Sequence, residues 1–196
     1  HYVYDNVNRI IQVTYPGNKS VSYDYDANSN RTKLTYPDSS HITYEYDQLN
    51  RLSTIKDQNA QAIASYSYDA LSRRKQLDYA NNTQSTYSYD DASRLLNQVN
   101  KIKDGANISS FTYTYDNVSN RKTMVTQAGA HSYTYDKIYQ LKSVDYPLGA
   151  SFPDKTFSYD GVGNRTQTVD GGTTNYTPNN LNQYTKVGTT DYNYDD

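Results

Sequence analysis

Residues 21–31 read VSYDYDANSNR, and this stretch contains the unit from which the rest of the chain is built. Its first five residues alternate at a period of two, which places Tyr23 and Tyr25 on one face of a β-strand. The residues from Asp26 to Asn30 are turn formers, because Asp and Asn side chains bond to their own backbone and tolerate positive φ. The stretch therefore predicts a strand that ends in a tight turn.

The Tyr-Asp pair at the end of this strand recurs along the whole chain, about every 21 residues. The copies are Tyr4-Asp5, Tyr25-Asp26, Tyr46-Asp47, Tyr68-Asp69, Tyr89-Asp90, Tyr115-Asp116, Tyr135-Asp136, Tyr159-Asp160 and Tyr194-Asp195. We expect a degenerate copy at Tyr176-Thr177. Most copies carry another Tyr two positions earlier, and Phe157 replaces it once. We call the earlier residue the first Tyr and the one before the Asp the second Tyr. Self-similarity of this kind indicates a repeat architecture.

Two further positions follow each Tyr-Asp pair. Four or five residues after the Asp comes Arg9, Arg31, Arg51, Arg73, Arg94, Arg121 or Arg165, with Gln140 standing in once. Eight or nine residues after it comes Val13, Leu34, Ile55, Leu77, Val99, Met124, Val144 or Val169. A Tyr-Pro step then turns the chain back at Tyr15-Pro16, Tyr36-Pro37 and Tyr146-Pro147. The pattern therefore predicts two short strands and two turns in each repeat.

These patterns predict an all-β fold of tandem antiparallel β-hairpins, since short turns join only antiparallel neighbours. Ten copies would give roughly 20 strands, and open sheets rarely exceed about ten strands without curling. We therefore expect a long curling sheet in which residues 1–196 form a single array of about ten repeats. The chain begins and ends inside a repeat, so we expect it to be a piece of a larger protein.

The composition points to an unusual core. Leu, Ile, Val and Phe make up 32 of the 196 residues, whereas the chain contains 24 Tyr. Tyr rings bury a large area when their hydroxyl groups find a partner, so we expect an ordered, aromatic and partly wet core. The net charge of -2 and the scattered basic residues argue against a nucleic-acid partner. Cys is absent, and no apolar run is long enough to span a membrane.

The pattern Tyr-x-Tyr-Asp-x-x-x-Asn-Arg resembles the YD repeat of the RHS/YD-repeat family, above all at residues 44–52 and 159–166. The stretch 180–188 also resembles one that is common late in such arrays. The resemblance implies a segment of a spiral β-shell that encloses a toxin or other cargo polypeptide in a bacterial secreted or cell-surface protein. The animal teneurins are distant relatives. The partners implied are the rest of the shell and the enclosed polypeptide. The family's self-cleaving aspartate pair matches no residues here.

No residue is expected to be catalytic, to bind a cofactor or to hold a metal, and the chain is not expected to be an enzyme. The repeated Asp and Arg are interpreted as turn and ring contacts, because every turn needs them. Asp24, Asp26, Asn28 and Asn30 have the spacing of a calcium loop, but Ser29 stands where an EF-hand loop needs Gly and Thr35 where it needs Glu. His1, His41 and His131 are far apart and are interpreted as surface residues.

Two predictions about partners remain. Rows of Tyr rings could stack on sugars, so the alternative function is a carbohydrate- or protein-binding adhesion module at the cell surface. The competing interpretation is that these rings pack against one another between hairpins. The strands at both ends of the chain, residues 2–4 and 192–194, would leave unpaired backbone groups. Exposed edges of this kind predict self-association of the chain.

Overall fold

The structure, a computed structural model, describes residues 1–194 and contains 19 β-strands and no helix in that range. The strands are β1 (Tyr2–Tyr4), β2 (Ile10–Tyr15), β3 (Lys19–Tyr25), β4 (Arg31–Thr35), β5 (His41–Tyr46), β6 (Leu52–Lys56), β7 (Ala62–Tyr68), β8 (Arg74–Tyr79), β9 (Thr83–Tyr89), β10 (Leu95–Ile102), β11 (Asn107–Tyr115), β12 (Arg121–Thr126), β13 (Gly129–Tyr135), β14 (Leu141–Asp145), β15 (Lys155–Tyr159), β16 (Arg165–Val169), β17 (Thr173–Pro178), β18 (Tyr184–Val187) and β19 (Thr190–Asp191). The prediction of an all-β fold of tandem antiparallel hairpins is confirmed.

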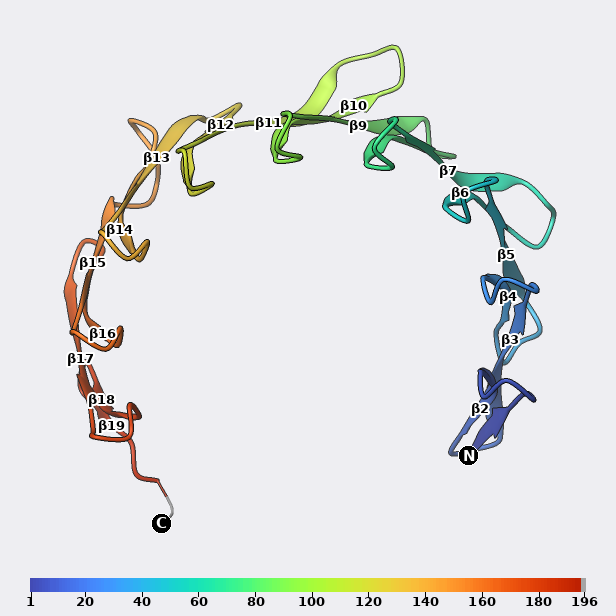
Figure 1. Ribbon diagram of the computed structural model, residues 1–196, viewed down its shortest axis with the longest axis horizontal. Coiled ribbons are helices and arrows are strands. Elements are labelled where there is room, and N and C mark those ends of the chain that lie inside the picture. The colour runs from blue at the N-terminus through green and yellow to red at the C-terminus, as the bar shows by residue number, and fades with distance from the viewer. Residues whose placement is uncertain (195–196) are drawn as a thin grey trace. The chain divides into compact units, whose positions relative to one another are not determined.

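The strands group into two compact units. The first unit holds His1–Ser88 and Val99–Ile108, and the second holds Tyr89–Gln98 and the residues from Ser109 onward. In the first unit each strand from β1 to β9 pairs antiparallel with the next strand in the chain. The strands from β11 to β19 of the second unit follow the same rule. Each unit is therefore a single layer in which sequence order is spatial order (Figure 1).

One class of turn has a fixed length. We call it the YD turn, since it begins at the Asp of the Tyr-Asp pair, and it always takes five residues, as in 26–30 between β3 and β4. The residue three positions after the Asp has a positive φ, from 59° at Asn50 to 94° at Gly163. This geometry is a type I turn followed by a bulge, and small or amide-bearing residues tolerate it. Within each unit the YD turns fold toward the same face of the layer (Figure 1).

The turns at the other ends of the strands, which we call the opposite turns, vary in length. They range from two residues between Thr126 and Gly129 to nine residues between Asp145 and Lys155. Because the YD turn is constant, differences in repeat length fall on the opposite turns and on the strands, as in β10 and β11, which have eight and nine residues. The YD-turn rim of the layer is therefore regular, and the opposite rim is where the array tolerates insertions.

In each unit the core is a row of side chains on the face that carries the tyrosines. Among the described residues, the buried hydrophobic side chains are Val13, Ala64, Leu77 and Val144, and the most buried of them, Leu77, is 4% exposed. Leu77 pairs with Tyr66 on one side and Ser85 on the other. Val13 and Val144 pair in the same way with Tyr2 and Tyr133. Three of the four buried residues thus lie directly across from the first Tyr of a repeat, the earlier of its two Tyr residues, whereas Ala64 pairs with Ile55 and Tyr79. We call the residue across from the first Tyr the core position.

The strand register separates two neighbouring positions of the sequence pattern and corrects one sequence prediction. Phe157 pairs with Thr168, which is 7% exposed, so Thr168 takes the core position and Val169 points to the other face. The expected copy at Tyr176-Thr177 is also displaced by two residues. Tyr176 pairs with Val187 and so takes the place of the first Tyr, while Asn179 takes the place of the Asp. Pairing register, which a local motif search does not contain, decides both positions.

Candidate functional site

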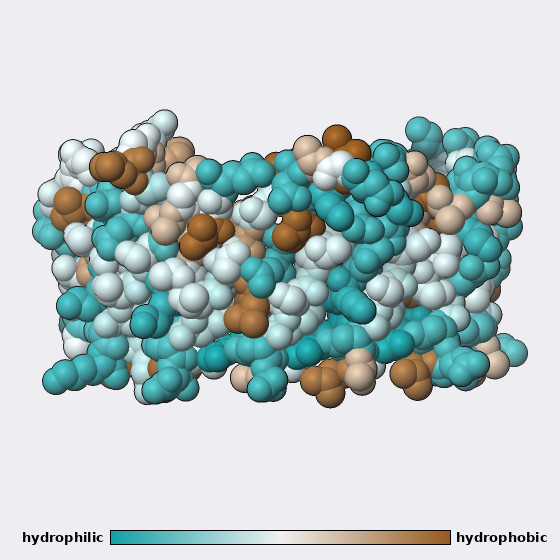
Figure 2. Space-filling view, turned by 90° about the horizontal axis from the view of Figure 1, so that it is seen from above, coloured by the Kyte–Doolittle hydropathy of each residue, from teal (hydrophilic) through white to brown (hydrophobic). Residues whose placement is uncertain are grey.

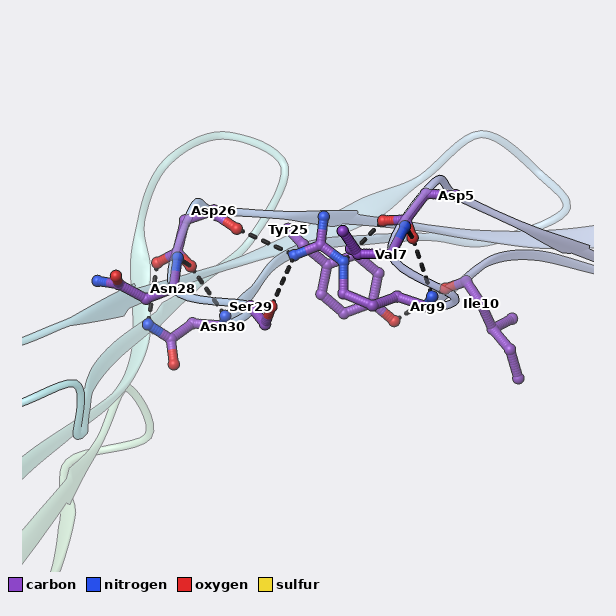
Figure 3. A network of polar contacts seen from close by, with 9 residues as sticks. All are labelled: Asp5, Val7, Arg9, Ile10, Tyr25, Asp26, Asn28, Ser29 and Asn30. Atoms are coloured by element: carbon purple, nitrogen blue, oxygen red, sulfur yellow. Dashed lines mark hydrogen bonds and ion pairs between the residues drawn. The ribbon is translucent and has the colours of Figure 1, made fainter.

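The repeated polar residues meet in the YD turns, and the turn at Asp5 shows how (Figure 3). Oδ1 of Asp5 accepts hydrogen bonds from the backbone amides of Val7 at 3.0 Å and Arg9 at 2.9 Å. Oδ2 accepts a third bond from Nε of Arg9 at 2.7 Å. The carboxylate therefore satisfies two turn amides and holds the Arg side chain in place.

Arg9 then reaches into the next repeat (Figure 3). Its Nη1 donates to the carbonyl of Asp26 and to Oγ of Ser29, both at 3.1 Å. Its guanidinium lies 4.7 Å from the centre of the Tyr25 ring. In return, the hydroxyl of Tyr25 donates to the carbonyl of Ile10 at 2.8 Å. The Arg of one repeat thus makes a cation–π contact with the second Tyr of the next repeat, and the hydroxyl group of that Tyr donates a hydrogen bond back to the first of the two repeats.

The same contacts recur in other copies. Arg51, Arg73 and Arg94 form ion pairs of 2.6 to 2.7 Å with the Asp four residues before them. The hydroxyl group of the second Tyr donates one repeat back, at 2.7 to 3.1 Å, in Tyr46, Tyr68, Tyr115, Tyr135 and Tyr159. The acceptors are the carbonyls of Arg31, Leu52, Leu95, Arg121 and Leu141. We call this set of contacts the repeat junction.

A second form of the junction occurs where Asn stands four residues after the Asp. Nδ2 of Asn30 then donates to Oδ2 of Asp26 at 3.0 Å, and the Arg moves to the next position. Arg31 lies between two first-position rings, 5.8 Å from the centre of Tyr23 and 4.7 Å from that of Tyr44. Arg121 and Arg165 are sandwiched between rings in the same way. An Arg four residues after the Asp, such as Arg9, therefore pairs with that Asp, whereas an Arg five residues after it, such as Arg31, lies between two first-position rings.

The junction changes the acidity of its members. In Asp5 the amide hydrogen bond from Arg9 outweighs the opposing effect of partial burial and holds the pKa of the carboxyl below its usual value. In Asp26 the leading cause of the lowered pKa is the side-chain bond from Asn30. Burial instead raises the pKa of the Tyr68 hydroxyl, so this hydroxyl stays protonated and can donate at neutral pH.

Replacing Tyr68 with Phe tests one repeat junction. The change removes the 2.7 Å bond to the carbonyl of Leu52 and keeps the ring. We expect the free energy of unfolding to fall by about 0.5–1.5 kcal/mol in urea titrations. The control is Tyr36→Phe, since Tyr36 is 41% exposed at an opposite turn, and its effect should stay within about 0.5 kcal/mol. Equal effects of the two changes would contradict the role of the hydroxyl.

The residues with calcium-loop spacing are used by the fold. Asp24 lies in β3 opposite Lys33, whereas Asp26 begins the YD turn. The Asp26 oxygens accept bonds from the amides of Asn28 and Asn30 and from the Asn30 side chain. Across residues 1–194, no three His, Cys, Asp or Glu side chains are grouped as metal ligands would be.

The histidines lie on different elements. His41 begins β5 opposite Thr35. His131 lies in β13 and pairs with Met124 in β12. Its ring contacts the ring of Tyr146 edge to face, with the ring centres 5.5 Å apart. His1 precedes β1.

Sequence analysis missed a pocket at the longest opposite turn. The pocket has a volume of about 430 Å³, and its lining includes His131, Tyr146, Leu148 and Phe152. Gly129, with a φ of 125°, lies against the lining residue Pro147, because a Cβ at this position would be 2.7 Å from the Cβ of Pro147. The lining is mainly apolar and aromatic, which suits an apolar group or a sugar ring. The signal for it in the sequence is the lengthened repeat with two Pro residues after Tyr135-Asp136.

Comparisons with known proteins address the repeat directly. The family model described as RHS Repeat matches residues 4–41. A search of curated proteins finds no match to the chain. No helix in the described part of the chain is long and apolar enough to cross a membrane.

Solved structures share the fold. The Tc holotoxin pore of Photorhabdus luminescens matches with a TM-score of 0.73 and 20% identity, over 86% of this chain and 10% of that chain. TcdB2-TccC3 matches with a TM-score of 0.76 and 18% identity, over 92% of this chain and 12% of that chain. TcdB2-TccC3 without its hypervariable C-terminal region matches with a TM-score of 0.74 and 22% identity, over 86% and 10%. The chain thus spans about a tenth of the length of these proteins.

Proposed function

We propose, from the premise that this chain is an array of RHS/YD repeats, that it forms part of a shell wall around a cargo polypeptide. The chain is a structural repeat scaffold of the kind found in Tc toxin proteins. The observation that carries the proposal is the similarity of 92% of the chain to TcdB2-TccC3, at a TM-score of 0.76. The enclosed cargo is the finer part of the proposal, and it rests on the resemblance to this family.

The repeat junction supports a scaffold role. The turn carboxylates hold the amides and the Arg or Asn of their own turn, whereas guanidinium groups such as that of Arg9 and hydroxyl groups such as that of Tyr25 contact the neighbouring repeat. The faces of rings such as Tyr25 and Tyr44 are covered by Arg9 and Arg31. A wall needs such lateral contacts, because a single layer cannot bury a core on both faces.

The proposed partners follow from the same premise. They are the rest of the shell and the polypeptide inside it, in a bacterial protein that is secreted or displayed at the cell surface. One of the similar proteins has a hypervariable C-terminal region, which is the kind of segment that such a wall would enclose.

The test is protease protection of the C-terminal polypeptide in the full-length parent protein. Leu77→Asp would place a charge in the core row and open the wall, whereas Ser67→Asp changes an exposed residue on the other face of β7. We expect Leu77→Asp to speed digestion of the polypeptide by about tenfold or more, because cleavage follows the population of the open state. Ser67→Asp should leave the digestion rate unchanged.

The same full-length protein and its two variants also test whether the chain encloses a cargo or serves as an adhesion module. The pocket formed around Tyr146 and Phe152 is the observation that favours a glycan-binding module. A C-terminal polypeptide that is digested equally fast in all three proteins, together with binding on a glycan array, would replace enclosure by adhesion. Protection without glycan binding would support the wall.

A further inference from the structure

Two positions of the YD turn bring neighbouring repeats into contact. The donor position lies four residues after the Asp and holds Arg, Asn or Gln. The acceptor position lies three residues after the Asp and has a positive φ. Hydrophilic residues are frequent along both rims of the surface in Figure 2, where the turns lie. The donor residue of one turn contacts the acceptor residue of the next YD turn, so the two positions have to be considered as a pair.

An Arg at the donor position is followed by Ser at the next acceptor position. In these pairs Nη1 of the Arg donates to Oγ of the Ser at 3.0 to 3.3 Å, and the pairs are Arg9 with Ser29, Arg51 with Ser72 and Arg94 with Ser119. Nε of the same three Arg residues donates to the Asp of their own turn. The guanidinium group therefore bridges two turns. In the sequence Arg73 is likewise followed by Ser93.

An Asn at the donor position is paired with Asn instead. Nδ2 of Asn30 donates to Oδ2 of Asp26 and to Oδ1 of Asn50, both at 3.0 Å. Nδ2 of Asn164 donates in the same way to the Asp of its own turn at 2.9 Å and to Oδ1 of Asn182 at 3.0 Å. A side-chain amide has two N–H groups, and here one serves its own turn and the other serves the next turn.

A Gln at the donor position contacts the backbone of the next turn. Nε2 of Gln140 donates to the carbonyl of Gly163 at 3.5 Å. A Cβ at Gly163 would lie 3.1 Å from this Nε2, so a side chain at the acceptor position would crowd the Gln. Within residues 1–194 one junction departs from these pairings, because Tyr139 takes the acceptor position after Asn120.

The pairing follows from a fixed gap between turns. Successive YD turns are two strands apart, or about 9.6 Å, and the two side chains together must span this gap. Arg is long and leaves room for the short Ser, whereas Asn is shorter and needs the longer Asn. The turn alone does not select Ser, because the left-handed region favours Gly and Asn. Ser29 and Ser72 nevertheless have φ values of 67° and 61°, so the Arg of the preceding turn accounts for them.

We propose that the acceptor residue of each YD turn selects the repeat that packs in front of it. Ser selects a repeat with Arg at the donor position, Asn selects a repeat with Asn, and Gly selects a repeat with Gln. The selection decides which hairpins can lie side by side in a wall built from this repeat. It does not depend on whether the wall encloses a cargo.

The rule identifies the partner that fits β1. The acceptor of the turn after β1 is Asn8, and Tyr2 and Tyr4 of β1 are 58% and 50% exposed. Asn8 selects a YD hairpin with Asn four residues after its Asp. Such a hairpin carries Arg one residue later, as Arg31 does, and Arg31 lies 4.7 Å from the ring centre of Tyr44, the first Tyr of the following repeat. The corresponding Arg of the partner would cover the ring of Tyr2.

Two extended chains test the selection at β1. One carries a copy of residues 21–42, whose donor is Asn30, joined in front of His1. The other carries a copy of residues 43–64, whose donor is Arg51. The two grafts have the same length and end at the same point of the repeat. The measurement is hydrogen exchange of the β1 amides, because β1 is the same in both proteins. We expect the Asn graft to slow this exchange more than the Arg graft does.

Asn8→Ser is the matched change, because Ser29 forms the same turn with a positive φ. The preference for the Asn graft, measured as the ratio of the two exchange rates, should fall by about threefold or more after Asn8→Ser. Differences between the grafts that do not involve the acceptor residue cancel in this comparison. A ratio that is the same with and without Asn8→Ser would overturn the proposal.

An internal junction tests the rule without a graft. Failure of both grafts to slow exchange would overturn the assignment of a partner to β1, and this junction then decides the rule itself. Arg51→Asn leaves Ser72 opposite a short donor, whereas Arg51→Asn together with Ser72→Asn rebuilds the pair seen at Asn30 and Asn50. The equilibrium constant for unfolding of the double variant should be about threefold or more below the value expected from the two single changes. Additive effects of the two changes in urea titrations would overturn the proposal.

Discussion

Replacing Leu77 with Ala is expected to lower the free energy of unfolding by about 2–3 kcal/mol. Leu77 is 4% exposed, the lowest value among the buried hydrophobic residues described. It lies between Tyr66 and Ser85 in the middle of the core row. A single-layer sheet has no second layer that could move in to fill the gap, so the lost contacts of the side chain should not be replaced. Urea titration followed by circular dichroism measures the effect.

Leu71→Ala is the matched control for this change. Both residues are Leu and they are close in the chain, since Leu77 lies within β8 and Leu71 lies in the YD turn before it. Leu71 is 64% exposed, so its truncation should change the free energy of unfolding by no more than about 0.5 kcal/mol in dilute solution. If the two variants lose equal stability, the row opposite the first Tyr is not the core of this fold.

The position of Leu77 could be predicted from the sequence, because every strand is specified locally. The period of two places Tyr66 and Tyr68 on one face, and Asp69 ends the strand in a turn that its own side chain stabilises. The constant five-residue YD turn then sets the register, so the residue eight positions after the Asp must meet the first Tyr. Repetition makes such local rules sufficient for the fold class.

The features that the sequence did not predict arise where one residue takes over the contact that another residue makes in other repeats. Arg at four or five residues after the Asp looks like one variable position. In the structure Arg51 pairs with its own Asp, whereas Arg31 lies between two rings because Asn30 has taken over the bond to the carboxylate. Thr168 likewise replaces an aliphatic residue at the core position. A polar residue there contradicts a hydrophobic pattern, so the search for an apolar residue selects Val169, although Thr168 lies eight positions after Asp160 and pairs with Phe157.

The pocket could not be predicted from the repeat for the opposite reason. The repeat motif describes what all copies share, whereas the pocket around Phe152 arises from an insertion in one opposite turn.

Acidification is expected to unfold the array, because the YD turns depend on ionised carboxylates. The carboxyl pKa is lowered in the folded chain in the turns of Asp5, Asp26, Asp47, Asp69, Asp90, Asp116 and Asp160. Partial burial raises the pKa and is the largest single effect in Asp47, Asp69 and Asp116. The hydrogen bonds from the turn amides and from the Arg or Asn side chain together outweigh it and lower the pKa. A folded pKa below the unfolded value of 3.8 means that the unfolded chain binds more protons near that pH.

The sign of the pH dependence follows directly. The contribution of these carboxylates to stability is complete above about pH 5, and it is lost as the pH falls through the folded pKa values. We expect a Tm that is constant from pH 7 to about pH 5 and then drops steeply toward pH 3. The 19 Lys and Arg residues stay charged in acid and add repulsion once the carboxylates are neutral. Circular dichroism melts at fixed ionic strength measure this profile.

Asn179 supplies the control for acid unfolding, because it performs the task of the turn Asp without a titrating group. Its Oδ1 accepts the amides of Leu181 and Gln183 at 2.9 and 3.0 Å, and its Nδ2 donates to Oε1 of Gln183. Changing Asp26, Asp116 and Asp160 together to Asn should reproduce this arrangement, since the Asn side chains four residues later can turn their oxygens toward the new amides. The triple variant should therefore keep the fold at pH 7 and lose less Tm between pH 5 and pH 3 than the native chain. An equal loss of Tm in both proteins would show that repulsion among the basic residues, and not protonation of the turns, unfolds the array in acid.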